Sequence, residues 1–126
     1  MRAFITTGAV VILVIVLSLS SFYVINSGTA EMSEYVSKIT ENVSSENWEG
    51  AKSELAASRD SWNEMYEWWS VIIDHGEIED IEFSLRKLDK YVEEQKKEDC
   101  LEELQSLKMS IDSVYYKEKP SWSNIF

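Results

Sequence analysis

The chain opens with a long uninterrupted run of apolar and small residues. Residues 3–25 contain no charged side chain, and residues 9–17 are entirely aliphatic. A helix rises 1.5 Å per residue, so about 20 apolar residues cross the ~30 Å hydrocarbon core of a bilayer. The run therefore predicts a transmembrane helix through residues 3–25.

The charges that flank this apolar segment, residues 3–25, predict its orientation. Arg2 precedes it, whereas Glu31 and Glu34 follow it closely. Positive charge is retained on the cytoplasmic side of a membrane. We therefore expect a single-pass protein of the cell membrane with a cytoplasmic N-terminus: residues 1–25 form the anchor, 26–30 a short linker, and 31–126 an extracytoplasmic domain.

A cleaved signal peptide is the alternative for the same segment. Gly28 and Ala30 are small residues at the spacing that a signal peptidase reads, with cleavage after Ala30. The apolar core of a signal peptide is typically about 7–15 residues long, which is shorter than this run, so the pattern favours a retained anchor. The run is followed by no nearby cysteine, which excludes lipoprotein modification.

Beyond the apolar segment, hydrophobic residues recur at helical spacing and strand-like alternation is absent. We expect four helices at about residues 30–45, 47–75, 77–96 and 98–116, with a cap from Ser27 or Thr29 for the first and from Asn47 for the second. Gly76 is expected to end the second helix. The apolar faces contain Met32, Val36, Ile39 and Val43; then Ile78, Ile81, Leu85, Leu88 and Val92; then Cys100, Leu101, Leu104, Leu107, Ile111 and Val114.

The second helix has the most regular apolar pattern. Its seam repeats at alternating spacings of three and four over four heptads, as in a coiled coil, and Tyr66 and Ile73 widen it. The seam consists of Trp48, Ala51, Leu55, Ser58, Trp62, Met65, Trp69 and Ile72. A widened seam favours the core of a bundle, and a coiled-coil homo-oligomer through this helix is the alternative.

These patterns predict an all-α fold: an N-terminal transmembrane helix followed by a small antiparallel bundle of three to four helices joined by short loops. Cys100 is the only cysteine, so packing must replace internal disulfides. We expect Cys100 to be a small buried residue, with an intermolecular disulfide as the alternative. Trp69 is expected in the core, and Trp122 and Phe126 of the C-terminal tail are expected to dock on the bundle.

A weak internal repeat occurs at an offset of 49 residues. Met32, Val36, Ile39, Val43, Ala51 and Leu55 align with Ile81, Leu85, Leu88, Val92, Cys100 and Leu104. A duplicated helical hairpin would produce this pattern, and so would two unrelated amphipathic hairpins with similar loops.

The net charge of the chain limits the classes of partner that it can bind. All 23 acidic residues and every basic residue except Arg2 follow the apolar segment, so this part carries a net charge of −12. Nucleic-acid phosphates and anionic lipid surfaces would be repelled. The acidity suits a soluble exterior, or a patch for a basic partner or for cations.

The segment densest in functional groups is residues 68–82, where the adjacent Trp68 and Trp69 precede a charged cluster at residues 74–82. It contains the only histidine and five carboxylates: Asp74, His75, Glu77, Glu79, Asp80 and Glu82. In a continuous helix His75 and Glu79 would lie one turn apart, but a metal site needs three or four ligands and no EF-hand spacing is present. We expect helix-end charges here, with cation or small-ligand binding by a sensor domain near Asp74–Glu82 as the alternative.

Motifs of catalysis are absent. The sequence has no Ser/His/Asp arrangement that suggests a catalytic triad, no reactive Cys/His pair and no glycine-rich phosphate loop. We therefore expect a non-enzymatic protein without cofactor or metal, which binds a membrane or envelope protein. The candidate contact residues are Trp68, Asp74, His75, Glu79 and Trp122.

The chain resembles DUF4363, a family of small single-span bacterial proteins of unknown function. The likeness rests on residues 47–52 (NWEGAK), 68–75 (WWSVIIDH), 77–88 (EIEDIEFSLRKL) and 124–126 (NIF). Gly76 departs from the helix-favouring residue that the family tends to carry. The resemblance implies a helical extracytoplasmic domain in Gram-positive, often spore-forming, bacteria, and it implies no activity.

Overall fold

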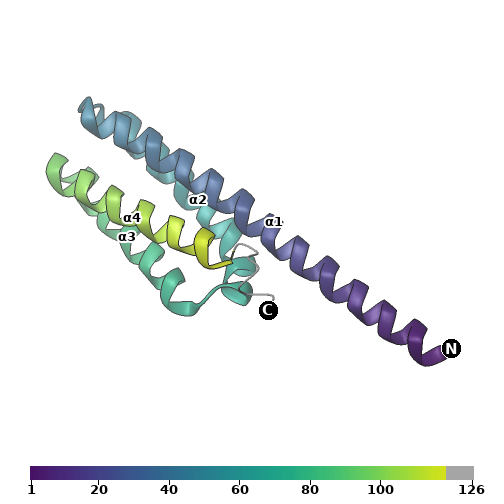
Figure 1. Cartoon of the computed structure of the whole chain (residues 1–126). Helices are drawn as coiled ribbons and strands as arrows, with labels where there is room; N and C mark the ends of the chain where they lie inside the picture. The colour runs from purple at the N-terminus through teal and green to yellow at the C-terminus, as the bar shows by residue number, and fades with distance from the viewer. Residues whose placement is uncertain (119–126) are drawn as a thin grey trace.

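The computed structural model describes residues 1–118, and four α-helices make up this part of the chain. They are α1 (Arg2–Ser44), α2 (Trp48–Ile72), α3 (His75–Glu93) and α4 (Lys97–Glu118), and the described residues contain no strand. Each helix packs against two antiparallel neighbours: α1 and α3 each contact both α2 and α4 (Figure 1). The predicted all-α antiparallel bundle is confirmed, and it has four helices.

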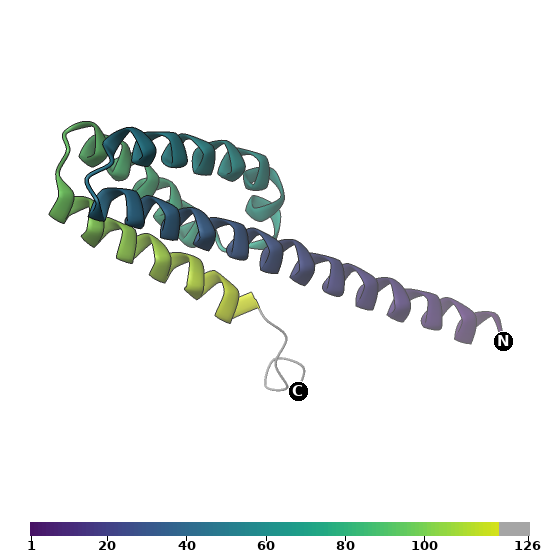
Figure 2. The same cartoon turned by 90° about the horizontal axis from the view of Figure 1, so that it is seen from above.

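Helix α1 is much longer than the others and extends well beyond them. All residues from 2 to 20 are exposed, whereas burial starts around Ser21 and is complete at Ile25. Figure 2 shows this N-terminal half projecting from one end of the bundle. Among the described helices, α1 is the one that is long and apolar enough to cross a membrane.

The expected linker at residues 26–30 is wrong as a structural boundary. Helix α1 passes through it without interruption, and Gly28 and Thr29 are buried in the bundle. Thr29 does not cap a helix; its Oγ1 donates a hydrogen bond to the carbonyl of Asn26 at 3.1 Å. Packing against α2 keeps these residues helical, so the bundle begins at Ile25 instead of residue 31.

The predicted apolar faces form the core. Val43, Ala51, Leu88, Leu107 and Ile111 are all less than 2 % exposed. Trp62 and Trp69 of α2 are also buried, and their rings meet edge to face with centroids 5.5 Å apart. The seam of α2 thus packs inside its own bundle, and the expectation that Trp69 and Cys100 are core residues is confirmed.

The helix boundaries confirm one predicted signal and correct another. The Asn47 side chain accepts a hydrogen bond from the Gly50 backbone N–H at 3.1 Å, which caps α2 as expected. Gly76 does not end α2, because α2 stops at Ile72 and Ile73 is extended (φ −104°, ψ 150°). Gly76 instead lies in the first turn of α3, and His75 begins that helix.

The two halves of the bundle have equivalent turns at the offset of 49 residues. Glu46 and Gln95 have positive φ angles, 59° and 54°, and end their turns in the left-handed conformation. Asn47 N–H donates to the carbonyl of Asn42, and Lys96 N–H donates to that of Tyr91, at 2.8 and 2.9 Å. The repeat in the sequence therefore corresponds to two hairpins, α1–α2 and α3–α4, with matching turn geometry.

The two ends of the bundle differ in what they carry. The α1–α2 and α3–α4 turns lie at one end, which we call the distal end (Figure 2). The α2–α3 turn and the last turn of α4 lie at the opposite end, from which the apolar segment projects (Figure 1). We call this the proximal end, and the cluster at residues 74–82 starts there.

Candidate functional site

The structure brings together two of the predicted contact residues at the proximal end. His75 Nε2 lies 3.0 Å from Glu79 Oε1, one turn apart on α3, and both side chains are mostly exposed. An exposed pair of this kind adds little to stability, typically about 0–1 kcal/mol. Loss of this mutual contact would therefore change the stability of the bundle little.

The remaining predicted contact residues are not gathered into one site. Asp74 is exposed immediately before α3, and its side chain makes no capping hydrogen bond. Trp68 is 67 % exposed on the penultimate turn of α2, with no hydrogen bond or ion pair to His75 or Glu79. Trp122 lies outside the described residues, as does the tail that we expected to dock.

The carboxylates of the proximal end do not form a ligand cage in the described part of the chain. No group of three or more His, Cys, Asp or Glu side chains is close enough to hold a metal ion in residues 1–118. The helical geometry explains this, because Glu77, Glu79 and Asp80 leave α3 in different directions.

A second cluster at the same end was missed by sequence reasoning. Glu77, expected on the surface as a helix-end charge, is buried between α3 and α4. Its Oε1 accepts a hydrogen bond from Ser113 Oγ at 3.3 Å and lies 2.8 Å from Lys117 Nζ. The hydrogen bond and the charge of Glu77 raise the pKa of Lys117.

The pattern of α3 contained a signal for this cluster. Glu77, Ile81, Ser84 and Leu88 follow the spacing of four, three and four that marks one helix face. All four are buried. A carboxylate on a core-facing stripe requires a cation from another helix, and only the fold shows that α4 supplies it.

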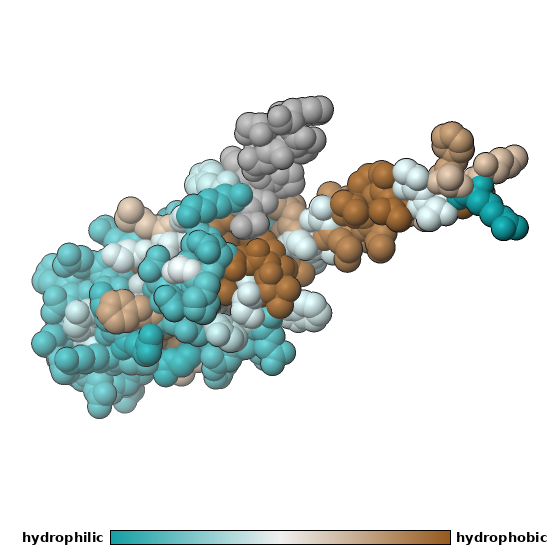
Figure 3. All heavy atoms as spheres, turned by 90° about the horizontal axis from the view of Figure 1, so that it is seen from below, coloured by the Kyte–Doolittle hydropathy of each residue, from teal (hydrophilic) through white to brown (hydrophobic). Residues whose placement is uncertain are grey.

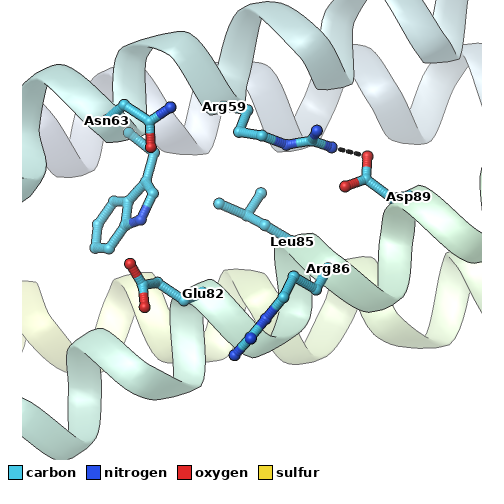
Figure 4. Close-up of a pocket in the computed structure, with 7 residues that line it drawn as sticks. Arg59, Asn63, Glu82, Leu85, Arg86 and Asp89 are labelled. Atoms are coloured by element: carbon cyan, nitrogen blue, oxygen red, sulfur yellow. Dashed lines mark ion pairs between the residues drawn. The ribbon is translucent and has the colours of Figure 1, made fainter.

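A cleft lined by charged side chains lies between α2 and α3 (Figure 4). It has a volume of about 320 Å³ and is lined by Arg59, Trp62, Asn63, Glu82, Leu85, Arg86 and Asp89. Arg59 forms an ion pair with Asp89 across the cleft, while Glu82 and Arg86 extend from α3 (Figure 4). The four charges balance, so the cleft has no net attraction for a simple cation.

The cleft also escaped sequence reasoning, apart from Glu82. Its polar residues are separated by up to 30 positions and lie on two helices. Among the described residues, Glu82 and Arg86 have no ion-pair partner.

Cys100 is held as an inert thiol. Its side chain is fully buried, and burial raises the pKa of the thiol to about 11, with a smaller effect from the charge of Asp99. Because the thiolate is the reactive form, a raised pKa removes reactivity near neutral pH. Its burial also leaves the sulfur out of reach of a second chain, which counts against the intermolecular disulfide.

Comparison with known proteins agrees with the sequence resemblance. The family model described as "Domain of unknown function (DUF4363)" matches residues 19–125, which is most of the chain. No curated protein and no solved structure matches the chain. The matched range includes the end of the apolar segment and the whole described bundle. The chain therefore belongs to the DUF4363 family.

Proposed function

We propose that this protein is a single-pass protein of the cell membrane whose extracytoplasmic bundle binds another membrane or envelope protein. The observation that carries the proposal is the continuity of α1 from the exposed apolar residues into the core. One unbroken helix transmits orientation, so the bundle would be held at a set height and angle above the bilayer. A flexible tether would give neither.

The height of the bundle also restricts the partner. Ile25 ends the apolar segment and is already a core residue of the bundle. No spacer separates the segment from the domain, so the proximal end would rest at the lipid–water boundary. A partner would have to be embedded in the membrane or lie close to its surface.

The chemistry of the proximal end supports a polar contact there. Asp74, His75 and Glu79 are exposed, and the part of the chain beyond the apolar segment has a net charge of −12. A basic surface on the partner would complement it and speed association. The sole histidine lies in an exposed ion pair and the sole cysteine is buried, which favours a binding role over catalysis.

Anchoring and topology can be tested together in intact cells. Glu49→Cys places a reactive thiol on the exposed first turn of α2 at the distal end. A membrane-impermeant maleimide should label this cysteine from outside the cell. Mass spectrometry should show that the labelled chain is full-length and retains Arg2. Labelling that occurs only after lysis would show the opposite topology. A mature chain that begins at Glu31 would show that the apolar segment is a cleaved signal peptide and not a retained anchor.

Partner binding can be tested by photo-crosslinking from defined positions. A photo-reactive residue at Asp80, exposed on α3 near His75 and Glu79, should crosslink to a discrete membrane protein in the native membrane. The same residue at Glu49 serves as the distal control. The crosslink should weaken in a His75→Ala, Glu79→Ala variant; equal products from both positions, or no effect of the variant, would overturn the proposed site.

A second candidate function rests on the α2–α3 cleft. Arg86 would bind the carboxylate of a zwitterionic amino acid, and Glu82 would bind its ammonium group. This candidate places the small-ligand site in the cleft and not at the 74–82 turn, where the sequence suggested it. Because a ligand that binds only the folded state stabilises it, millimolar free amino acids should raise the unfolding temperature. Arg86→Gln should abolish the shift, and an unchanged temperature across all twenty amino acids would remove the candidate.

A further inference from the structure

We propose that the end of α2, through Val71 and Trp68, is a second membrane contact that inserts into the headgroup region of a zwitterionic bilayer. This rests on the proposed anchoring by α1. It assigns Trp68 to lipid and leaves Asp74, His75 and Glu79 as the contacts with a protein partner.

The first argument is position along the membrane normal. Trp69 of α2 lies directly against Gly28 of α1, because a Cβ on Gly28 would be 2.6 Å from Trp69 Cζ2. The two helices are antiparallel, so each residue after Trp69 lies closer to the apolar segment by about 1.5 Å. Val71 is therefore roughly level with residues 25–27, where the apolar segment ends.

The second argument is the character of the outward face of α2. Along most of the helix this face is polar, with exposed Ser53, Asp60, Glu64 and Glu67. It becomes apolar only near the end, where Trp68 is 67 % and Val71 is 83 % exposed. These two residues are three positions apart, which places both side chains on one side of the helix.

One face of the molecule shows where its hydrophobic residues gather. Most of the bundle is hydrophilic in Figure 3, whereas hydrophobic atoms gather at the end of the bundle nearest the apolar segment. Tyr23, also exposed, lies on α1 at the same end. Exposed tryptophan and tyrosine at this level match the aromatic belts that mark the lipid–water boundary.

The dimensions of a bilayer accommodate the contact. The headgroup layer adds about 5–7 Å on each side of the hydrocarbon core. Val71 lies about 4–5 Å beyond the level of Tyr23, and Trp68 about 9 Å beyond it. A spanning helix tilts by about 20° on average, and a tilt toward α2 would bring both residues into this layer.

Charge decides the lipid class. The carboxylates of Asp74, Glu79 and Asp80 are exposed at the same end, and Glu77 is already paired with Lys117. Anionic headgroups would be repelled by this surface, whereas zwitterionic ones would not. Two contacts on one side of the anchor would fix its rotation, so the partner-binding residues of α3 would face a constant direction.

The contact can be tested in the full-length chain reconstituted into phosphatidylcholine vesicles. The background is Cys100→Ala, because alanine already occupies the equivalent core position 51 in the other hairpin. An environment-sensitive fluorophore is attached to Val71→Cys, and quenching by lipids with a nitroxide near the headgroup is measured. Ser53→Cys is the matched control, because it is exposed on the same face of α2 and lies five helical turns, about 27 Å, nearer the distal end.

The expected result is strong quenching and a blue-shifted emission at position 71, and neither at position 53. Adding phosphatidylglycerol should reduce the quenching at position 71. A label at Leu13→Cys separates the two proposals: if Leu13 is quenched by lipids with a deep nitroxide but Val71 is not quenched at all, α1 is an anchor and the lipid contact is overturned. In that case, protection of position 71 in native membranes but not in vesicles would identify a protein as the occupant. If Leu13 is also unquenched, the anchoring itself fails.

Discussion

Gly28 of α1 lies directly beneath the indole of Trp69 in α2. A Cβ at position 28 would be 2.6 Å from Trp69 Cζ2 and 2.8 Å from Met65 Sδ, which are closer than real contacts allow. The absence of a side chain lets the two helices approach where the apolar segment enters the bundle. This contact packs α2 against α1 at the point where the apolar segment continues into the bundle.

Gly28→Ala should destabilise the bundle even though alanine favours helix. The gain in helix propensity is about 1 kcal/mol, whereas forcing a methyl into packed side chains costs about 1–3 kcal/mol. The ring of Trp69 is fully buried, so we expect the packing cost to dominate, with a net loss of up to about 2 kcal/mol. Denaturant unfolding of the full chain in detergent, followed by circular dichroism, measures it.

Gly76→Ala is the control for that experiment. Gly76 is also helical, but a Cβ there would meet only Asp74 Oδ2, at an ordinary 3.9 Å. The substitution should leave stability unchanged or raise it by up to about 0.5 kcal/mol, since the site is in the first turn. A stabilising Gly28→Ala would show that the α1–α2 contact is looser than the structure has it.

The equivalent turn residues Glu46 and Gln95 should each be improved by glycine. Both have positive φ, a conformation that costs a residue with a Cβ about 1 kcal/mol. Glu46→Gly and Gln95→Gly should each raise the free energy of unfolding by up to about 1 kcal/mol. Similar gains would confirm that the two turns are equivalent, and a loss at one of them would show that its side chain has a stabilising contact of its own.

Cys100 should resist modification as long as the protein is folded. With the pKa raised to about 11, the thiolate is only about one part in a thousand at pH 8, and the sulfur is buried. Iodoacetamide should therefore label Cys100 rapidly in denaturant and very slowly without it. Fast labelling of the native chain, or a disulfide-linked dimer on a non-reducing gel, would contradict this placement.

The same thiol predicts a pH dependence of stability. Folding raises the pKa of Cys100 from 9.0 to about 11, so the folded state binds the proton more tightly. The resulting stabilisation is complete below pH 9 and is lost as the pH rises through 11. Cys100→Ala should reduce the loss of stability between pH 9 and 11. The free energy of unfolding of the variant is subtracted from that of the wild type at each pH, because lysines titrate in the same range in both proteins.

The pair of Glu77 and Lys117 should show coupling in a double-mutant cycle. Lys117→Met leaves a buried carboxylate without its cation and should lower the unfolding temperature, by less than Gly28→Ala does because Lys117 is largely exposed. Glu77→Gln with Lys117→Met should recover most of the loss. Additive effects of the two substitutions would show that the pair does not interact in solution.

The raised pKa of Lys117 in the folded state also predicts a pH dependence of stability. The partner Glu77 holds the lysine charged in the folded state, so its contribution is present below the ordinary lysine pKa and disappears as the pH rises above it. Exposure of the lysine keeps this effect small. Any stability advantage of the wild type over Glu77→Gln should therefore decrease as the pH rises above the ordinary lysine pKa.

Much of this fold follows from periodicity alone. The spacing of apolar residues identified α2, α3 and α4 within a few residues of their bounds, and the buried faces of these helices are the predicted ones, whereas α1 was expected as two helices. Asn47 was recognisable as a cap because its neighbours in sequence supply the bond. Helical periodicity and capping are local properties, so the order of residues is enough to determine them.

The candidate site was less accessible to the same reasoning. His75 and Glu79 pair as their spacing allows, but the helix boundary next to them was misplaced, because α2 already ends at Ile72 and Gly76 lies in the first turn of α3. The cleft between Arg59 and Arg86 joins residues that share no local pattern. Its existence depends on how α2 meets α3.

The sequence by itself determined the helical class of this protein, its apolar N-terminal segment, its acidity and the faces that form the core. Only the tertiary structure decided that α1 is continuous through Gly28, that Glu77 is buried against Lys117, and that Val71 and Trp68 emerge beside the apolar segment. The physical reason is separation along the chain. Gly28 remains helical because Trp69, 41 residues later, packs against it, and no local pattern contains that contact.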